Sequence, residues 1–179
     1  MCAGITLYAP LKKFGVRGDK KLNIGVVGIG GLGTMGIKIA AALGHNVTAI
    51  SRSAHKEKLA QEKGAKGFIN SSDPESMAKG AASLHLIVNT VSAPHQLKDL
   101  LPLLKSKGTL VQLGLVTEPH TFSQLDILFS NKTITASMIG GIADTQELLE
   151  LCAEHNIAPD VQHIEANQID WAYDQLLAG

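Results

Sequence analysis

Short aliphatic runs alternate with longer, helix-patterned segments along most of this 179-residue chain. The strand-like runs are residues 22–27, 46–51, 68–70, 84–89, 109–113 and 133–139, and the helix-patterned segments are residues 31–43, 55–63, 73–81, 94–104, 122–129 and 144–155. Any single run could be part of a buried helix, so the prediction rests on the repeated order. Strict alternation of nearly continuous apolar strands with helices predicts an α/β fold, a doubly wound parallel sheet with right-handed crossovers.

One turn in this alternation carries a glycine pattern with a clear physical use. Directly after a predicted strand, and opening a predicted helix, the chain reads Gly28-Ile29-Gly30-Gly31-Leu32-Gly33, which fits G-x-G-x-x-G. Gly28 permits the tight turn, Gly30 lets the backbone approach a pyrophosphate, and Gly33 lets the helix pack closely on the sheet. Free N–H groups and the positive end of the helix dipole then face the phosphates. The pattern predicts a dinucleotide-binding Rossmann domain, and the alternative is a tight turn without a ligand.

The end of the next predicted strand indicates which dinucleotide binds. In NAD-binding domains an acidic residue about 20 residues after the glycines hydrogen-bonds the ribose 2′-hydroxyl. This chain has Ser51 there, followed by Arg52, Ser53 and Lys56, and residues 51–56 contain no carboxylate. A guanidinium can bind a phosphate bidentately, and an ammonium adds a mobile charge. The segment predicts NADP over NAD and disfavours an S-adenosylmethionine methyltransferase, while the alternative is that Arg52 and Lys56 are solvated surface charges.

Net charge and cysteine content exclude several other classes of protein. The 16 basic and 16 acidic residues balance, which argues against a broad basic surface for nucleic acid or anionic membrane. No apolar run approaches the roughly 20 residues of a membrane span, and the N-terminus has no signal-peptide pattern, so we expect a cytoplasmic protein. Cys2 and Cys152 are too few for a disulfide framework or a structural zinc site.

Two terminal stretches do not follow the alternation. We interpret residues 1–20 as a lead-in segment that ends at the first strand, because turn formers accompany basic residues there: Pro10, Lys12, Lys13, Gly15, Arg17, Gly18 and Lys20. Residues 21–160 then form the NADP-binding Rossmann domain. Residues 161–179 hold a strand-like run over 161–164 and an amphipathic helix from about residue 168 to 177, which stops at Gly179.

Several separated segments occur in the order and spacing typical of one enzyme family. They are Cys2-Ala3-Gly4-Ile5-Thr6 with Tyr8 and Pro10, the glycine turn, residues 51–56, Asn89-Thr90-Val91, Leu113-Gly114 and Ser137-Met138-Ile139-Gly140. Through them essentially the whole chain resembles the coenzyme domain of the zinc-dependent medium-chain alcohol dehydrogenases, specifically the cinnamyl alcohol dehydrogenase branch. Members of this branch interconvert small-molecule alcohols and aldehydes with NADP by hydride transfer.

The resemblance implies roles for the matched positions. Ser51, Arg52 and Lys56 match the positions that hold the 2′-phosphate, and Thr90 matches a residue near the nicotinamide-side ribose. The positions that match backbone contacts to the nicotinamide end are Gly114, Ser137, Met138 and Ile139. For residues 137–139 ordinary strand-end turn chemistry is an equal alternative. The strand from Thr133 to Ile139 matches the edge strand through which two such domains pair into a homodimer, and an uncovered edge strand favours pairing.

Cys2 has a particular place in the resemblance. In the family the cysteine of the C-A-G-I-T segment is a ligand of the catalytic zinc, and the other protein ligands and the proton relay come from an N-terminal catalytic domain. Catalytic zinc takes about three protein ligands, so Cys2 alone makes no site. We therefore expect no catalytic residue and no aldehyde reduction from this chain by itself. We expect it to be functionally incomplete at both ends, with residues 161–179 returning toward the missing domain.

Two other functions fit the same residues. One is a stand-alone NADP-binding sensor module without catalysis, and the other is a zinc-free quinone reductase of the same superfamily, which Cys2 in its motif disfavours. Tyr8 and Lys12 also fit Tyr-x-x-x-Lys, the acid/base pair of short-chain dehydrogenases. That pair precedes the glycine turn here, and we expect Pro10 to break the helical stacking of its members.

Overall fold

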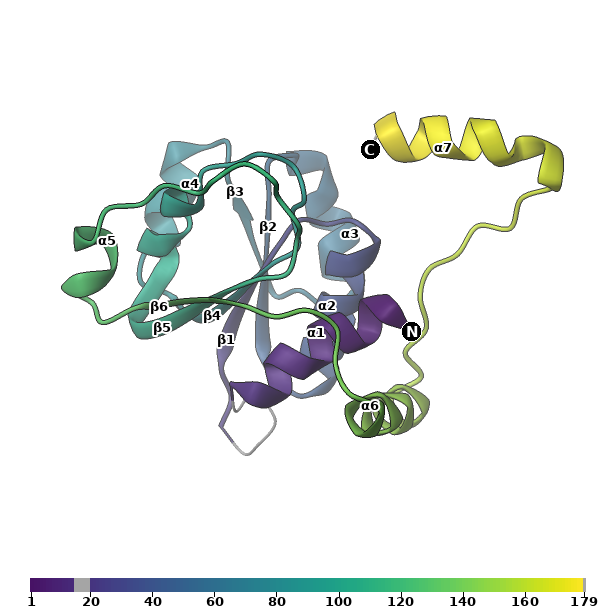
Figure 1. Ribbon diagram of the computed structural model, residues 1–179, viewed down its shortest axis with the longest axis horizontal. Helices are drawn as coiled ribbons and strands as arrows, with labels where there is room; N and C mark the ends of the chain where they lie inside the picture. Colours follow the sequence, from purple (N-terminus) through teal and green to yellow (C-terminus); the bar gives the residue numbers. More distant parts are fainter. Residues whose placement is uncertain (15–19, 179) are drawn as a thin grey trace.

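The computed structural model describes residues 1–14 and 20–178, and a six-stranded parallel sheet runs through its centre (Figure 1). The strands are β1 (Asn23–Val27), β2 (Asn46–Ser51), β3 (Gly67–Asn70), β4 (Leu84–Asn89), β5 (Leu104–Gln112) and β6 (Thr133–Ala136). Their spatial order is β3-β2-β1-β4-β5-β6, so the direction of winding reverses between β1 and β4. Open sheets of this kind bind ligands beyond the carboxyl ends of the strands at that reversal. The predicted doubly wound parallel sheet is confirmed.

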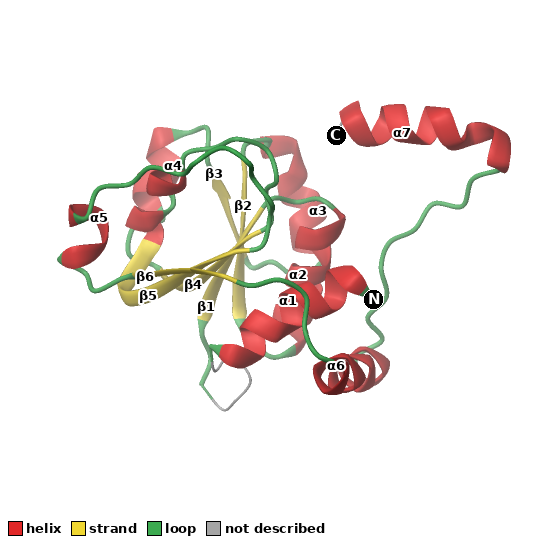
Figure 2. Ribbon diagram, viewed as in Figure 1, coloured by secondary structure: helices red, strands yellow, loops and turns green. Residues whose placement is uncertain are grey.

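Helices cover both faces of the sheet (Figure 2). The helices packed around the sheet are α1 (Cys2–Lys13), α2 (Gly31–Ala42), α3 (Glu57–Glu62), α4 (Pro74–Lys79), α5 (Leu125–Leu128) and α6 (Ile142–Glu154), whereas α7 (Ile169–Ala178) stands apart. Successive strand residues enter opposite layers, as the pleat requires. Val26 joins a core with side chains of α1, α2 and α6, whereas Val27 joins a second core on the face that carries α4 and α5.

Residues 2–13 form helix α1, although the lead-in interpretation of residues 1–20 gave them no such element. Leu7, Tyr8 and Leu11 are at most 1% exposed, and the helix packs against α2 and α6. A Cβ at Gly36 of α2 would lie 2.8 Å from Leu7 Cδ1, so the two helices approach closely because this position is glycine. The buried positions of α1 run almost continuously from Gly4 to Leu11, so no one-sided helical periodicity marked this helix in the sequence. Gly15, Arg17 and Gly18 lie outside the described residues.

Pro10 does not interrupt α1, so the expectation that it separates Tyr8 from Lys12 is wrong. Proline removes one N–H donor, but its neighbours keep the helix because they are held in the core. The Tyr8 hydroxyl donates to a Glu147 carboxylate oxygen of α6 at 3.0 Å, and the Lys12 ammonium contacts Glu147 at 2.9 Å and Asp144 at 2.7 Å. These bonds raise the pKa of Lys12, Asp144 contributing most. Through these bonds Tyr8 and Lys12 join helix α1 to helix α6.

Four predicted elements are shorter than expected or absent. Residues 94–104 do not form an α-helix but two 3-10 turns, η2 (Leu97–Asp99) and η3 (Leu101–Leu103), after which β5 begins. Pro102 explains this, because proline lacks the donor that an α-helix needs and disfavours helical geometry in the residue before it. The helix expected over 122–129 is the single turn α5, and β6 ends at Ala136 rather than Ile139. Residues 161–164 form no strand.

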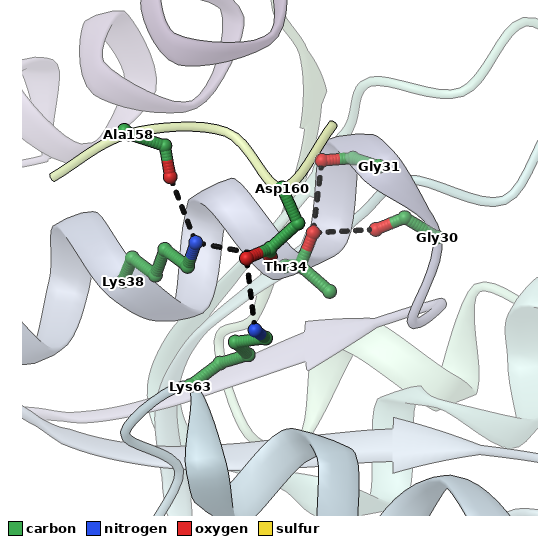
Figure 3. A network of polar contacts seen from close by, with 7 residues as sticks. All are labelled: Gly30, Gly31, Thr34, Lys38, Lys63, Ala158 and Asp160. Atoms are coloured by element: carbon green, nitrogen blue, oxygen red, sulfur yellow. Dashed lines mark hydrogen bonds and ion pairs between the residues drawn. The ribbon is translucent and has the colours of Figure 1, made fainter. Parts of the chain in front are cut away.

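The segment after α6 is fastened to the body of the domain at one carboxylate (Figure 3). Asp160 accepts from the Lys38 ammonium at 3.0 Å and from the Lys63 ammonium at 2.9 Å, and Lys38 also donates to the Ala158 carbonyl at 2.8 Å. Beyond this anchor the chain leaves the domain, and α7 stands apart from the sheet (Figure 1). The predicted C-terminal helix is confirmed as α7, and Gly179, where it was expected to stop, lies outside the described residues.

We expect Asp160→Asn to open this anchor. Hydrogen bonds from Lys63 and then Lys38 lower the pKa of Asp160 below its ordinary value. The stability that the anchor contributes is therefore complete above that ordinary pKa, and it is lost as the pH falls through the lower pKa of the folded state. Hydrogen exchange measured at neutral pH should rise several-fold in peptides covering residues 156–164. Asp170→Asn, in exposed α7, is the matched control and should change nothing there. Unchanged exchange in Asp160→Asn would contradict the anchor.

Candidate functional site

The predicted site residues meet because one row of paired residues crosses the sheet at its carboxyl edge. The row, read along the hydrogen-bonded register, is Ile50, Val27, Asn89, Gln112 and Ala136. The next residues in the chain are predicted cofactor residues: Ser51, Gly28, Thr90 and Ser137, with Gly114 two positions after Gln112. Segments up to about a hundred residues apart in sequence therefore end at one edge, where an open α/β sheet binds its ligand.

The glycine turn has the geometry that its sequence predicts. Gly28 has φ +89°, a left-handed conformation that favours glycine, and its N–H donates to the Ile50 carbonyl at 3.0 Å. A Cβ at Gly33 would lie 1.8 Å from the Gly28 carbonyl oxygen, so α2 can follow the turn this closely only without a side chain there. Within the turn, Ile29 is buried in the core and Leu32 packs against it, so these two contribute backbone rather than side chains to the site.

The amino end of α2 is open. Its N-cap is Gly30, which makes no side-chain capping bond, and a Cβ placed at Gly30 or Gly31 would meet no described atom within 4 Å. Thr34 donates to the carbonyls of Gly30 and Gly31, not to the amide groups (Figure 3). First-turn N–H groups have no intrahelical partner, and the helix dipole adds positive potential there. This end of α2 therefore has the chemistry of an anion site.

Thr90 and Gly114 secure the neighbouring strand ends. The Thr90 hydroxyl donates to the Val27 carbonyl at 2.7 Å, which fastens β4 to the start of the glycine turn. A Cβ at Gly114 would lie 2.1 Å from the Val91 carbonyl oxygen, and the Gly114 N–H donates to the Asn89 carbonyl at 3.0 Å. Both residues thus have structural roles in addition to their predicted contact with a ligand.

A cleft of about 410 Å³ opens beside the turn, between the ends of β1, β2 and β4. Of the predicted residues, those that line it are Gly28, Ile29, Gly30, Ser51, Arg52, Ser53 and Lys56. Arg52 is exposed and Lys56 half-buried, so both cations can reach a ligand, and the Ser51 hydroxyl oxygen accepts from the Ser53 N–H at 3.2 Å. Among the described lining residues the acidic one is Asp99, on the far wall in η2.

The structure does not bring every predicted residue into this cleft. Leu32, Gly31 and Gly33 lie at the start of α2 outside its lining, and Thr90 and Gly114 do not line it either. Residues 137–139 follow β6, which is separated from β1 by β4 and β5. Met138 is 83% exposed, and Ile139 has φ +47°, an unusual conformation for a β-branched residue. These positions could meet a ligand only where it extends across the sheet edge past β4 and β5.

Sequence reasoning missed one wall of the cleft. Ser71, which follows β3 as Ser51 ends β2, lines it, and so do Val91 and the segment that includes Ala93, His95 and Gln96. Its position directly after a predicted strand could have identified Ser71 as a candidate site residue from the sequence. Most of the 93–96 segment fell within the helix predicted over residues 94–104, so no pattern in the sequence indicated that it forms a wall of the cleft.

Cys2 lies exposed at the first turn of α1. Within residues 1–14 and 20–178 there is no group of three or more His, Cys, Asp or Glu side chains that could hold a metal ion. The described residues thus do not by themselves fit a zinc site. No described helix has the length and apolarity needed to cross a bilayer.

Comparison with known proteins shows close relatives. The profile of a family described as "Zinc-binding dehydrogenase" matches residues 31–154. The chain is 44% identical to an aldehyde reductase of Escherichia coli K12 over 180 residues, which cover 100% of this chain and 51% of that protein. A cinnamyl alcohol dehydrogenase from Sorghum bicolor superposes with a TM-score of 0.94 at 35% identity, over 99% of this chain and 50% of that one. A cinnamyl alcohol dehydrogenase from Helicobacter pylori, solved with NADP(H), gives 0.85 at 37% identity, over 98% and 50%. The chain spans about half the length of these relatives.

Proposed function

The chain belongs to the zinc-binding dehydrogenase family, and on that basis we propose that it is the NADP-binding part of an enzyme that interconverts alcohols and aldehydes. The observation that carries the proposal is one cleft that joins the uncapped amino end of α2 at Gly30 to the cations Arg52 and Lys56. A dinucleotide with an additional ribose phosphate needs both features. The NADP(H) bound to the Helicobacter pylori relative is consistent with this assignment.

Each part of the dinucleotide has a proposed set of partners. The first-turn N–H groups of α2 would hold the pyrophosphate, and Arg52 and Lys56, with the hydroxyls of Ser51 and Ser53, would hold the 2′-phosphate. Because the Thr90 hydroxyl already donates its proton to the Val27 carbonyl, it would offer a ribose hydroxyl an acceptor. Gly114 and residues 137–139 would flank the nicotinamide end. The bound cofactor supplies the hydride donor or acceptor of the reaction.

The reaction itself requires groups that the described residues do not supply. Cys2 is one thiol where a catalytic zinc takes about three protein ligands, so the described residues do not complete a zinc site. We propose that Cys2 serves as a zinc ligand only together with residues from elsewhere in the enzyme, which would also supply the substrate pocket. A cytoplasmic location stays a prediction from sequence.

The edge of the sheet supports a proposed homodimer. β6 is one of the two edge strands of the described sheet and pairs on one side only, with β5. An unpaired strand edge is a template for another strand, and a second copy of β6 would continue the sheet without changing either protomer. The proposed interface, predicted over Thr133 to Ile139, would consist of the strand of residues 133–136 and the turn that follows it.

Calorimetric titration of the chain with NADPH and NADH tests the proposal. We expect NADPH to bind at least about tenfold more tightly, because charge-assisted bonds to a phosphate contribute roughly 1.5–3 kcal/mol. We also expect no aldehyde reduction by the chain alone. Equal affinity for the two dinucleotides would contradict the assignment of Ser51, Arg52 and Lys56, and failure to bind either would contradict the proposed function.

A further inference from the structure

Four polar side chains form a connected group beside the cleft. Asn89, which is fully buried, donates from Nδ2 to Gln112 Oε1 at 2.6 Å, and the same Nδ2 lies 2.7 Å from His95 Nε2. Gln112 Nε2 lies 3.3 Å from His120 Nε2, and the two imidazole rings meet edge to face with centroids 5.2 Å apart. Asn89 and Gln112 are register partners in the row of paired residues at the carboxyl edge. Burying amides in a sheet costs free energy unless their hydrogen bonds are satisfied. A connected group of this kind therefore points to a structural or functional role.

The direction of every hydrogen bond in the group follows from one backbone amide. The Val91 N–H donates to Asn89 Oδ1 at 3.3 Å, which turns the two Nδ2 donors toward His95 and Gln112. His95 Nε2 must therefore accept, so its proton is on Nδ1, which donates to the Ala93 carbonyl at 2.8 Å. Gln112 Oε1 accepts from Asn89, so Gln112 Nε2 donates to His120 Nε2. Both histidines are thereby assigned as neutral, with the proton on Nδ1.

The backbone at the same residues holds the neighbouring strand ends. The Asn89 carbonyl accepts from the N–H groups of Leu113 at 2.9 Å and Gly114 at 3.0 Å. The Gln112 carbonyl accepts from the Ser137 N–H at 3.1 Å. His95 and its neighbours in the 91–96 segment line the cleft, so the Asn89 side chain connects a cleft wall to the strand ends that carry Gly114 and Ser137.

We propose that Asn89 is a positioning residue for dinucleotide binding, which holds the 91–96 wall in place through His95 and Gln112. The inference rests on the proposed function, because the cleft is taken as the cofactor site. Asn89 need not touch the cofactor. Asn89 would act on the cleft in two ways. Its amide holds His95 by donating to Nε2, and it holds the carboxyl end of β5 by donating to Gln112.

Nitrogen-15 NMR of the histidine rings in the cofactor-free chain tests the group directly. We expect His95 to carry its proton on Nδ1 at neutral pH. Asn89→Asp keeps the acceptor for Val91 but removes both donors, so His95 should become protonated at Nε2. His163, exposed between α6 and α7 and outside this group, is the internal reference in the same spectrum. A His95 proton on Nε2 in the unchanged chain, or a His95 ring unaffected by Asn89→Asp, would overturn the inference.

Titration with NADPH tests whether the group affects cofactor binding. Two variants of His95 keep this test valid if Asn89→Asp does not fold. His95→Gln offers Asn89 an amide oxygen and Ala93 an amide donor, so NADPH affinity should stay within about threefold. His95→Leu loses both hydrogen bonds, one part-buried and one exposed, and should bind NADPH about tenfold more weakly. His163→Leu is the control and should bind as the unchanged chain does. Equal losses in the two His95 variants would overturn the positioning role. If the unchanged chain binds no dinucleotide, the proposed function fails, while the NMR result still decides whether the hydrogen-bonded group exists.

Discussion

Gly33→Ala is expected to destabilise the chain strongly, whereas Gly30→Ala and Gly31→Ala leave its stability nearly unchanged. A methyl group at Gly33 would lie 1.8 Å from the Gly28 carbonyl oxygen, which belongs to the backbone and cannot rotate away. Relief requires α2 to shift from the turn, at a cost of about 3 kcal/mol or more, the upper end of ordinary overpacking. In thermal unfolding followed by circular dichroism, the midpoint should fall by roughly 6–12 °C for a domain of this size.

The two control variants separate stability from binding. A Cβ at Gly30 or Gly31 meets no described atom within 4 Å, and Gly30 has φ −107° and ψ −166°, extended backbone that alanine adopts readily. Their unfolding midpoints should therefore stay close to that of the unchanged chain. Gly30→Ala should nevertheless weaken NADPH binding, because its methyl group would occupy the space through which the pyrophosphate approaches the backbone. Similar destabilisation by all three substitutions would show that the turn does not pack as described.

Arg52→Ala is expected to weaken NADPH binding by roughly 10- to 100-fold and to leave NADH binding unchanged. The guanidinium is exposed at the rim of the cleft, where it can form charge-assisted hydrogen bonds with a 2′-phosphate that NADH lacks. Lys56→Ala should have a smaller effect in the same direction, because an ammonium acts as a point charge without the bidentate geometry. Calorimetric titration of each variant with both dinucleotides gives the two ratios.

Lys58→Ala is the matched control for these variants. Lys58 is exposed on α3, two residues from Lys56, but it does not line the cleft, so its loss removes the same charge without a predicted contact. It should lower NADPH affinity only through long-range attraction, which about 0.15 M salt largely screens. Equal effects of Arg52→Ala and Lys58→Ala, or equal losses for NADPH and NADH, would show that the specificity for the phosphate lies elsewhere.

Agreement between sequence and structure is best where the pattern is local. The bounds of β2 and β4 agree with prediction at both ends. The glycine turn was equally predictable, since its φ angle and close packing depend on residues within one turn of the chain. Agreement is worst at α1, where burial holds a helix together despite Pro10, and at residues 94–104, where Pro102 prevents the expected helix.

The sequence by itself determined the alternating elements, the glycine turn and the positive charge after β2. Only the tertiary structure decided which strand ends meet. The register row that joins Val27 to Ile50, Asn89 and Gln112 depends on hydrogen bonds between distant segments, and no local pattern encodes that pairing. The Asn89 group and the Asp160 anchor likewise exist only once the chain has folded, because their members come from different elements. Side chains that bind one another across a fold leave no periodic trace in sequence, whereas backbone conformation and burial do.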